Sequence, residues 1–219
     1  MMKRRIERLK TKLPEQVALV AVTKTHPINQ IMEAYEAGLR DFGENKVQEM
    51  IEKQPQLPAD VRWHLIGHLQ TNKVKYIAPF VHLIHSIDSL KILAEINKQA
   101  AKNERVIDCL LQIYIAAEET KFGLSPEEAL QLLESEKVQK MKNVRICGLM
   151  GMATFTDNQE QVKSEFKTLK KFFNQLKSNR FSKEDSFNIL SMGMSGDYLL
   201  AIEEGSTMVR IGTAIFGLR

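Results

Sequence analysis

The chain has 219 residues, of which 43% are hydrophobic and 26% charged, and its net charge is +4. Such values are typical of a globular protein with a sizeable core, and no Pro/Gly/Ser-rich linker divides the sequence, so we expect one domain over residues 1–219. The lysines are spread along the chain instead of forming one stripe, which argues against nucleic-acid binding. No apolar run reaches membrane-spanning length and no cleavage site follows the basic N-terminus, which predicts a cytoplasmic protein without a membrane partner.

The two cysteines, Cys109 and Cys147, each lie inside an apolar run. Their number and spacing indicate neither a disulfide scaffold nor a zinc site. We expect them to be small core residues of a protein in a reducing compartment.

The first part of the chain predicts a helix, a strand and a second helix. Residues 2–13 have apolar side chains at helical spacing among basic ones. Residues 17–24 form a continuous apolar run that ends in Lys24, as expected for a strand buried on both faces in a parallel sheet. Pro27 then starts a helix over residues 28–37.

The rest of the chain repeats this alternation of strand and helix. The further strands expected are 41–46, 61–69, 81–88, 106–116, 144–152, 187–192 and 208–216. Six helices are expected after these strands. The first ends near residue 53 and the fourth begins at Ser125, while the others run over 70–79, 89–102, 159–178 and 195–204.

Eight strands alternating with helices predict an α/β fold, a single (β/α)₈ barrel of the TIM type. The rival is a doubly wound open sheet, but such a sheet would leave edge strands, and no short charged strand is evident. We expect no outer helix after the eighth strand, and the N-terminal helix is expected to fill that gap.

In such a barrel, functional residues gather at the C-terminal ends of the strands. The polar residues expected near those ends are Lys24, Asn45, His64, His68, Ser86, Gln112, Ser191 and Arg210. Lys24 can extend to solvent, or it can lie in an apolar pocket where desolvation lowers its pKa and makes it a nucleophile.

A phosphate site is indicated near the end of the sequence. Residues 191–197 combine serines and glycines where a helix is expected to begin, and Gly212 and Thr213 follow the strand of Arg210. Helix N-termini and glycine-rich turns offer free N–H groups to anions, and these loops are the usual phosphate site of the barrel. Ser195 alone could be a helix cap and Gly212 a bulge; their joint placement beside Lys24 favours the phosphate site.

A lysine amine and a phosphate site together suggest pyridoxal 5′-phosphate (PLP), which needs an amine for its aldehyde and donors for its phosphate. Arg210 is then expected to face the pyridine nitrogen. Because arginine cannot give up its proton at neutral pH, the ring nitrogen would stay unprotonated and the electron sink would be weak. This disfavours demanding carbanion chemistry.

Two other groups receive weaker interpretations. His64 and His68 would share one face of a strand without an acidic partner at zinc-protease spacing, so we predict no metal site. Lys121 could reach the site from the loop after the fifth strand, but a solvated lysine is the preferred interpretation.

Six motifs occur in order between residues 19 and 217. They are Ala21-Val-Thr-Lys-Thr25, Phe42-Gly-Glu-Asn-Lys-Val-Gln-Glu49, Trp63-His-Leu-Ile-Gly-His-Leu-Gln70, Gly148-Leu-Met-Gly-Met152, Leu190-Ser-Met-Gly-Met-Ser195 and Ser206-Thr-Met-Val-Arg-Ile-Gly-Thr-Ala-Ile-Phe-Gly217. Together they resemble the pyridoxal phosphate homeostasis protein family, relatives of the N-terminal barrel of alanine racemase. The resemblance implies the type III PLP fold.

The resemblance also implies how the cofactor is held. Lys24 would carry PLP as a Schiff base, Arg210 would meet the pyridine nitrogen and Asn45 would line the ring. The phosphate would be surrounded by Ser191, Ser195, Gly212 and Thr213. Members of this family are regarded as monomeric PLP binders of vitamin B6 homeostasis with no established reaction, and the resemblance implies the same for this protein. PLP-dependent apo-enzymes are candidate recipients of the cofactor.

The fifth-strand region departs from the family pattern at Tyr114 and Phe122, which alters the rim on that side. The alternative function is a PLP-dependent amino-acid racemase, which needs a second base opposite the lysine. In alanine racemase a tyrosine from an additional β domain supplies that base, and we expect no such domain here. Tyr114 is a weak substitute, so a non-catalytic carrier or regulator is preferred over an enzyme.

Overall fold

The eight strands of the protein form a closed parallel barrel in a computed structural model that describes residues 1–116 and 122–217. The strands are β1 (Ala18–Val22), β2 (Asp41–Glu44), β3 (Arg62–Leu65), β4 (Leu83–Ile87), β5 (Ile107–Gln112), β6 (Val144–Met150), β7 (Ile189–Ser191) and β8 (Met208–Ile211). Each pairs with the next in sequence and β8 pairs with β1. The expected (β/α)₈ barrel is confirmed, and the closure rules out an open sheet.

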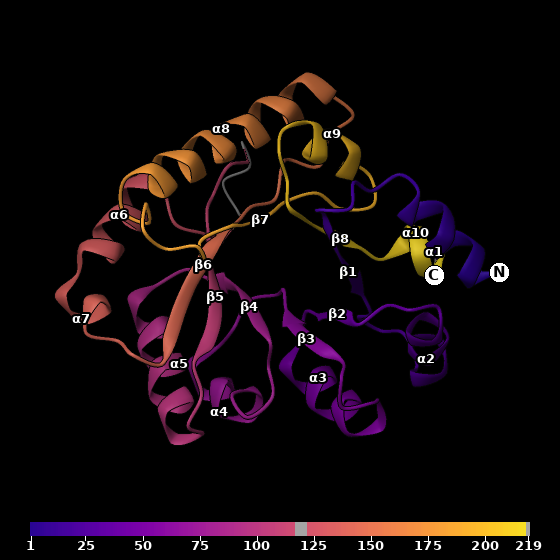
Figure 1. Cartoon of the computed structure of the whole chain (residues 1–219), viewed down its shortest axis with the longest axis horizontal. Helices are drawn as coiled ribbons and strands as arrows, with labels where there is room; N and C mark the ends of the chain where they lie inside the picture. The colour runs from indigo at the N-terminus through magenta and orange to yellow at the C-terminus, as the bar shows by residue number, and fades with distance from the viewer. Residues whose placement is uncertain (117–121, 218–219) are drawn as a thin grey trace.

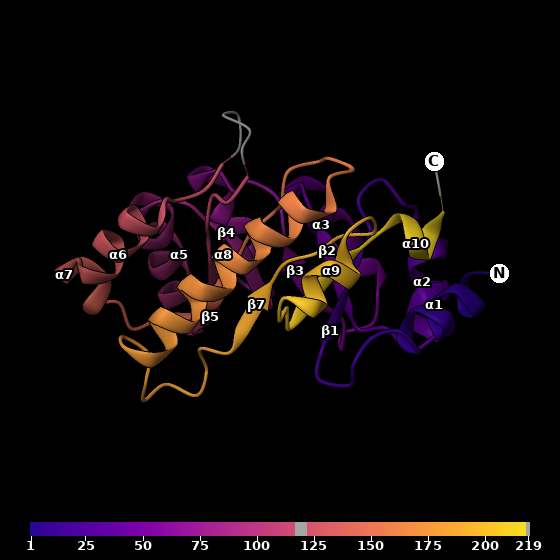
Figure 2. The same ribbon diagram turned by 90° about the horizontal axis from the view of Figure 1, so that it is seen from above.

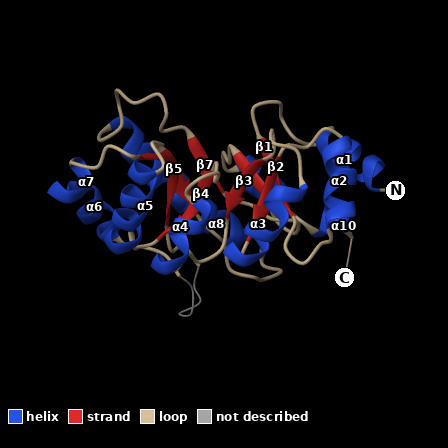
Figure 3. Ribbon diagram, turned by 90° about the horizontal axis from the view of Figure 1, so that it is seen from below, coloured by secondary structure: helices blue, strands red, loops and turns tan. Residues whose placement is uncertain are grey.

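Helices surround the strands, which Figure 3 shows in red at the centre of the molecule. The helices are α1 (Met2–Lys10), α2 (Ile28–Glu36), α3 (Val47–Lys53), α4 (Val74–Ile77), α5 (Leu90–Lys102), α6 (Pro126–Glu134), α7 (Glu136–Gln139), α8 (Gln159–Ser178), α9 (Tyr198–Glu203) and α10 (Thr213–Phe216), with 3₁₀ turns η1 (Gln54–Gln56) and η2 (Thr71–Lys73). Within the described residues, no helix is long and apolar enough to cross a membrane.

Local sequence signals account for the clearest helix starts. The Ser125 hydroxyl accepts the N–H of Glu128, whose carboxylate accepts the N–H of Ser125, so α6 begins with a full capping box. Ser89 caps α5 by accepting the N–H of Ile92. The expected range of α8 is confirmed, and its buried residues recur every three or four positions, as in a helix with one apolar face.

The gap beside β1 and β8 is covered by α1 together with α10. In Figures 1 and 2, α1 lies beside α2 and α10, and its residues Ile6 and Leu9 are buried against the main core. The expected role of the N-terminal helix is therefore confirmed. The expectation of no helix after the eighth strand is wrong: β8 ends at Ile211, Gly212 turns the chain, and the short helix α10 follows.

The inside of the barrel holds a small apolar cluster that is separate from the core between strands and helices. Its members are Val20, Leu83, Leu110, Cys147, Met150 and Met208. Both cysteines are buried and unpaired, as expected, and burial raises the pKa of Cys147 to about 12. Buried polar side chains occupy the remaining interior positions on β3, β4, β7 and β8: His64, His85, Ser191 and Arg210.

Candidate functional site

Two adjoining cavities open at the C-terminal ends of the strands. Their volumes are about 560 Å³ and 290 Å³, a range typical of small-molecule sites. Both are lined by Lys24 and Arg210, together with Val22 and Met194. The first cavity is also lined by Ser195, Gly212 and Thr213, and the second by Asn45, His68, Gln112 and Phe122.

Lys24 lies in the turn just after β1, and its two neighbours fix that turn. The Thr23 hydroxyl donates to Glu44 Oε1 at 2.6 Å, and the Thr25 backbone N–H donates to Glu49 Oε2 at 2.7 Å. Thr25 has a φ of 63°, in the left-handed region that a threonine seldom adopts. The backbone on both sides of Lys24 is therefore held by carboxylates of β2 and α3.

Lys53 of α3 joins these groups into an anchor network made of Thr23, Glu44, Glu49 and Lys53. Its ammonium donates to Glu44 Oε1 at 2.7 Å, to Glu49 Oε2 at 3.1 Å and to the Thr23 carbonyl at 2.9 Å. Burial raises the pKa of Glu44, against the opposing effect of the bonds from Lys53 and Thr23. This network was not predicted from the sequence, although the Glu49–Lys53 spacing on a predicted helix was a signal for it.

Arg210 is buried on β8 and forms part of the wall of both cavities. Its guanidinium donates from Nη1 to Ser191 Oγ at 2.6 Å and from Nη2 to the Gly151 carbonyl at 3.0 Å. Burial lowers the pKa of Arg210 to about 10, while the nearby Asp197 charge acts in the opposite direction. The group therefore stays positively charged at neutral pH.

The first cavity offers hydroxyl and N–H groups beside the start of α10. Ser195 Oγ accepts the backbone N–H of Gly212 at 3.3 Å and that of Ala214 at 3.5 Å. The turn before Ser195 depends on Gly193, which has a φ of 97° and whose Cβ, if present, would lie 2.7 Å from the Ala201 Cβ. This wall can supply donors to an anion.

The second cavity is bounded by groups from the loops after β2, β3 and β5. A Cβ at Gly67 would clash with the Asn45 carbonyl, so the close approach of these two loops requires glycine. Gln112 Nε2 donates to the Phe122 carbonyl at 2.8 Å, and the Phe122 ring stacks on His68 at 4.8 Å. An aromatic rim therefore flanks this side of the site.

The structure brings together six of the seven residues proposed for cofactor binding and places the seventh behind them. Ser191 is fully buried and lies behind Arg210, outside the residues that line either cavity. Ser86 is buried as well, with no hydrogen-bond partner for its hydroxyl among the described residues. Tyr114 is not among the lining residues of the two cavities, and Lys121 lies outside the described residues.

The two histidines of the third motif do not share a face. Because β3 ends at Leu65, His68 lies in the following loop, where its Nδ1 is 3.2 Å from Asp88 Oδ2. His64 instead contacts His85 inside the barrel and Asp41 at its N-terminal end. The expectation of a shared face is wrong, since the loop begins earlier than the apolar run suggests.

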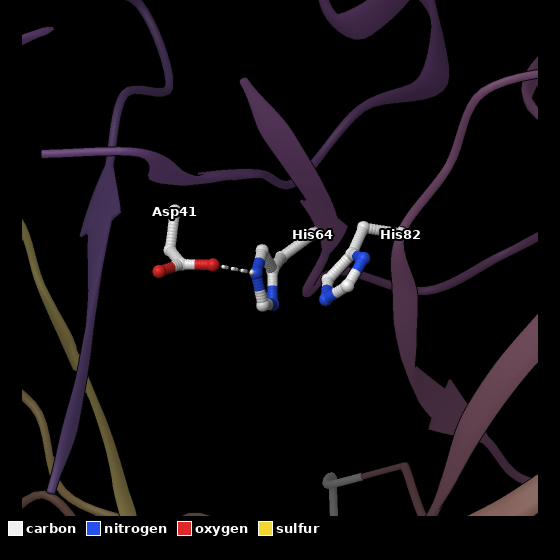
Figure 4. Close-up of side chains that lie close together, drawn as sticks. All are labelled: Asp41, His64 and His82. Carbon is white, nitrogen blue, oxygen red and sulfur yellow. Dashed lines mark hydrogen bonds and ion pairs between the residues drawn. The ribbon is translucent and has the colours of Figure 1, made fainter. Parts of the chain in front are cut away.

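Asp41, His64 and His82 form a separate cluster at the N-terminal end of the barrel, with potential ligand atoms within 4.8 Å of one another (Figure 4). Both Asp41 carboxylate oxygens already accept hydrogen bonds from the Arg62 guanidinium. A metal ion would have to displace that positive charge. We therefore treat Asp41 and His64 as a hydrogen-bonded pair, with the His82 ring packed beside His64, and not as a metal site.

Comparisons with known proteins place these features in a family. All 219 residues match the family described as alanine racemase, N-terminal domain. The pyridoxal phosphate homeostasis protein of Aquifex aeolicus (strain VF5) is 42% identical over 206 residues, covering 92% of this chain and 86% of that protein. The protein of the same name from Schizosaccharomyces pombe is 40% identical over 208 residues, covering 93% of this chain and 84% of that protein.

Solved structures give a consistent result. PipY of Synechococcus elongatus PCC7942, solved with PLP bound, has a TM-score of 0.89 and 35% identity, covering 99% of this chain and 100% of that one. An alanine racemase of Clostridium difficile 630 has a TM-score of 0.77 at 15% identity, a likeness of fold alone, and this chain covers 56% of it. The chain thus belongs to the pyridoxal phosphate homeostasis protein family, within the alanine racemase N-terminal domain group.

Proposed function

We propose that this protein binds PLP as part of intracellular PLP homeostasis and holds the cofactor as a Schiff base on Lys24. The observation that supports this most is the placement of Lys24, Arg210 and the Ser195 hydroxyl on one cavity wall. The family relationship adds support, because PipY was solved with PLP bound. When bound, PLP supplies an aldehyde that reacts with an amine and a phosphate that accepts hydrogen bonds.

The residues present fit that cofactor. Lys24 provides the amine, and Ser195 and Thr213 provide hydroxyl donors on the same cavity. The Gly212 N–H beside them donates to Ser195 Oγ, which leaves the Ser195 hydroxyl proton to be donated to a phosphate. Asn45 lines the adjoining cavity, where a ring could lie. Arg210 presents only donors, so it can orient a pyridine nitrogen but cannot leave a proton there at neutral pH. This donor set favours holding the cofactor over using it as an electron sink.

We propose further that residues 1–219 act as one cytoplasmic, monomeric PLP-binding unit, a carrier or regulator. The racemase alternative would require a second proton-transferring group, and Tyr114 is not among the lining residues of the two cavities. Incubation with L-alanine followed by chiral chromatography tests this part of the proposal. Rapid inversion of the amino acid would overturn it, and sedimentation analysis would test the monomer.

Borohydride trapping tests the cofactor assignment. The protein is incubated with PLP, reduced, digested and mapped by mass spectrometry, alongside Lys24→Met and the control Lys46→Met, which removes a nearby exposed lysine. We expect one modified peptide, carrying Lys24, in the wild type and in the control, and none in Lys24→Met. A label on another lysine, or no label, would contradict the assignment of Lys24 as the residue that holds PLP.

PLP-dependent apo-enzymes are the recipients that we propose. Three exposed apolar side chains surround the mouth of the cavities, Phe122, Phe155 and Met194, with exposed fractions of 61%, 98% and 37%. Exposed apolar groups around a site are typical of contact surfaces for other proteins. Phe155→Ser should slow PLP transfer to an apo-aminotransferase, measured by recovered activity, whereas Val106→Ser, an exposed apolar position beside the start of β5, should not. Equal rates would contradict the proposed contact.

A further inference from the structure

A continuous series of hydrogen bonds crosses the barrel interior from Arg210 to Asp41, and we call these five residues the interior wire. Arg210 Nη1 is 2.6 Å from Ser191 Oγ, Ser191 Oγ is 3.1 Å from His85 Nδ1, His85 Nε2 is 3.0 Å from His64 Nδ1, and His64 Nε2 is 2.9 Å from Asp41 Oδ1. The members come from β8, β7, β4, β3 and β2, so the wire runs from the cavity wall to the opposite end of the barrel. Figure 4 shows its last bond, between His64 and Asp41.

The middle of the wire has almost no access to solvent. Ser191 and His85 are fully buried, and His64 is 1% exposed. Burial lowers the pKa of His85 well below its usual value, so this imidazole is neutral. Burial alone would raise the pKa of Asp41, but the hydrogen bonds from Arg62 and His64 outweigh that effect and keep the carboxyl ionised.

The two ends determine the direction of every bond between them. A guanidinium can only donate hydrogen bonds, and an ionised carboxylate can only accept them. When each imidazole carries one proton, His64 must donate from Nε2 to Asp41, so its Nδ1 accepts from His85 Nε2. His85 Nδ1 then accepts the Ser191 hydroxyl proton, which leaves the Ser191 oxygen to accept from Arg210. With one proton on each imidazole, no other placement of the protons makes all four bonds.

We propose that His64 and His85 are positioning residues for Arg210, held in the Nε2–H tautomer by the negative charge of Asp41. A group that donates a hydrogen bond to one neighbour is polarised by it and becomes a stronger acceptor for the hydrogen bond from its other neighbour. Asp41 therefore strengthens the acceptor that Ser191 offers to Arg210, and this fixes the guanidinium on the cavity wall. The effect on cofactor binding rests on the proposed function, whereas the tautomers do not.

The barrel offers a matched control for Asp41. Asp108 of β5 accepts two hydrogen bonds from Arg145, at 2.7 Å and 2.9 Å, as Asp41 does from Arg62. Both aspartates lie at or near the start of their strands, but only Asp41 contacts a histidine of the wire. Asp41→Asn and Asp108→Asn therefore remove comparable ion pairs, and only the first disturbs the wire.

The tautomers can be measured on the protein without cofactor. Long-range ¹H–¹⁵N correlation spectra of histidine-labelled protein distinguish a protonated ring nitrogen from an unprotonated one, and His64→Gln and His85→Gln assign the signals. We expect Nε2–H tautomers for both histidines in the wild type and in Asp108→Asn, and a mixture of tautomers in Asp41→Asn. A doubly protonated His64, an Nδ1–H tautomer of His85, or identical spectra for the two asparagine variants would overturn the proposal.

Cofactor affinity tests the coupling to Arg210. His85→Leu removes both bonds of the imidazole, and we expect it to weaken PLP binding about tenfold in an absorbance titration, as for one lost hydrogen bond to a charged group. His85→Asn, which keeps an acceptor near Ser191, should recover part of this loss. Leu83→Ala is the control, because it removes apolar packing inside the same barrel and none of the hydrogen bonds of the wire.

The outcomes separate this inference from the proposed function. Wild-type affinity in His85→Leu would contradict the positioning role even if the tautomers are as expected. If the wild-type protein binds no PLP, the proposed function fails while the tautomers still decide whether the wire exists. If PLP binds but the tautomers differ, the wire alone is wrong.

Discussion

Single residues differ in how much of their role the sequence reveals. Lys24 is visible because a buried apolar run ends on a charge, and the structure places it on the cavity wall. His64 and Ser191 were expected at the rim, but both lie deeper in the barrel. Their hydrogen-bond partners come from distant parts of the chain. Ser191, for example, bonds to His85, 106 positions away, and no local sequence pattern encodes such a contact. Local patterns therefore single out Lys24, whereas the residues that support the cavity wall emerge only from the closed barrel.

The lowered pKa of His85 predicts that the protein is less stable at acidic pH. Its pKa is lowered by burial, so the unfolded state binds the additional proton as the pH falls through about 6.5. Stability is therefore retained above that value and lost below it, by up to about 1.4 kcal/mol per pH unit for one imidazole. Urea unfolding at pH 7.5 and 5.5 should show a larger loss for the wild type than for His85→Asn, by about 1 kcal/mol. Equal losses would mean that the buried imidazole takes up a proton without unfolding.

At the scale of elements, the sequence located the strands better than their ends. Each expected strand contains an observed one, but the third was expected over residues 61–69 and β3 ends at Leu65. Apolar residues such as Ile66 continue past Leu65, the last paired residue of β3, because the loops at this end are themselves packed against one another. The turn carrying Lys24 likewise depends on another element, since its anchors are on β2 and α3.

The anchor network makes α3 a support for the turn that carries Lys24. Lys53→Met would leave the fully buried Glu44 carboxylate without its cation, and we expect unfolding to become easier by roughly 3 kcal/mol, with weaker PLP binding. The control Lys98→Met breaks an exposed pair on α5 and should change stability by less than about 0.5 kcal/mol. The double variant Lys53→Met/Glu44→Gln should regain part of the loss in urea unfolding; no recovery would argue that packing of the lysine stem is what matters.

The whole molecule depends on how the barrel is closed. β1 pairs with β8, so the first and last strands of the barrel meet, and α1 covers this junction together with α10. The sequence indicated that an N-terminal helix covers this junction, but not that α10 shares it. Gly212 and Thr213 lie inside an apolar stretch that could equally have continued as a strand.

Removing the apolar contact of α1 should therefore affect the entire barrel. Ile6 is fully buried, and Ile6→Ala should destabilise the protein by about 2–4 kcal/mol in a single cooperative transition. Arg8→Ala, on the exposed side of the same helix, should stay within about 0.5 kcal/mol of the wild type. Two separate transitions, monitored by circular dichroism during urea unfolding, would show instead that α1 unfolds on its own.

The interior wire also limits which chemistry the protein can acquire by mutation. A carboxylate at position 210, the kind of group that would protonate a pyridine nitrogen, would put groups that only accept at both ends of the wire. Four bonds would then share the three protons of Ser191, His85 and His64, and a fourth proton would have to enter the buried interior. A carboxylate at position 210 is thus disfavoured by Asp41 at the opposite end of the barrel. We therefore expect such a change at position 210 to require a change at Asp41 as well.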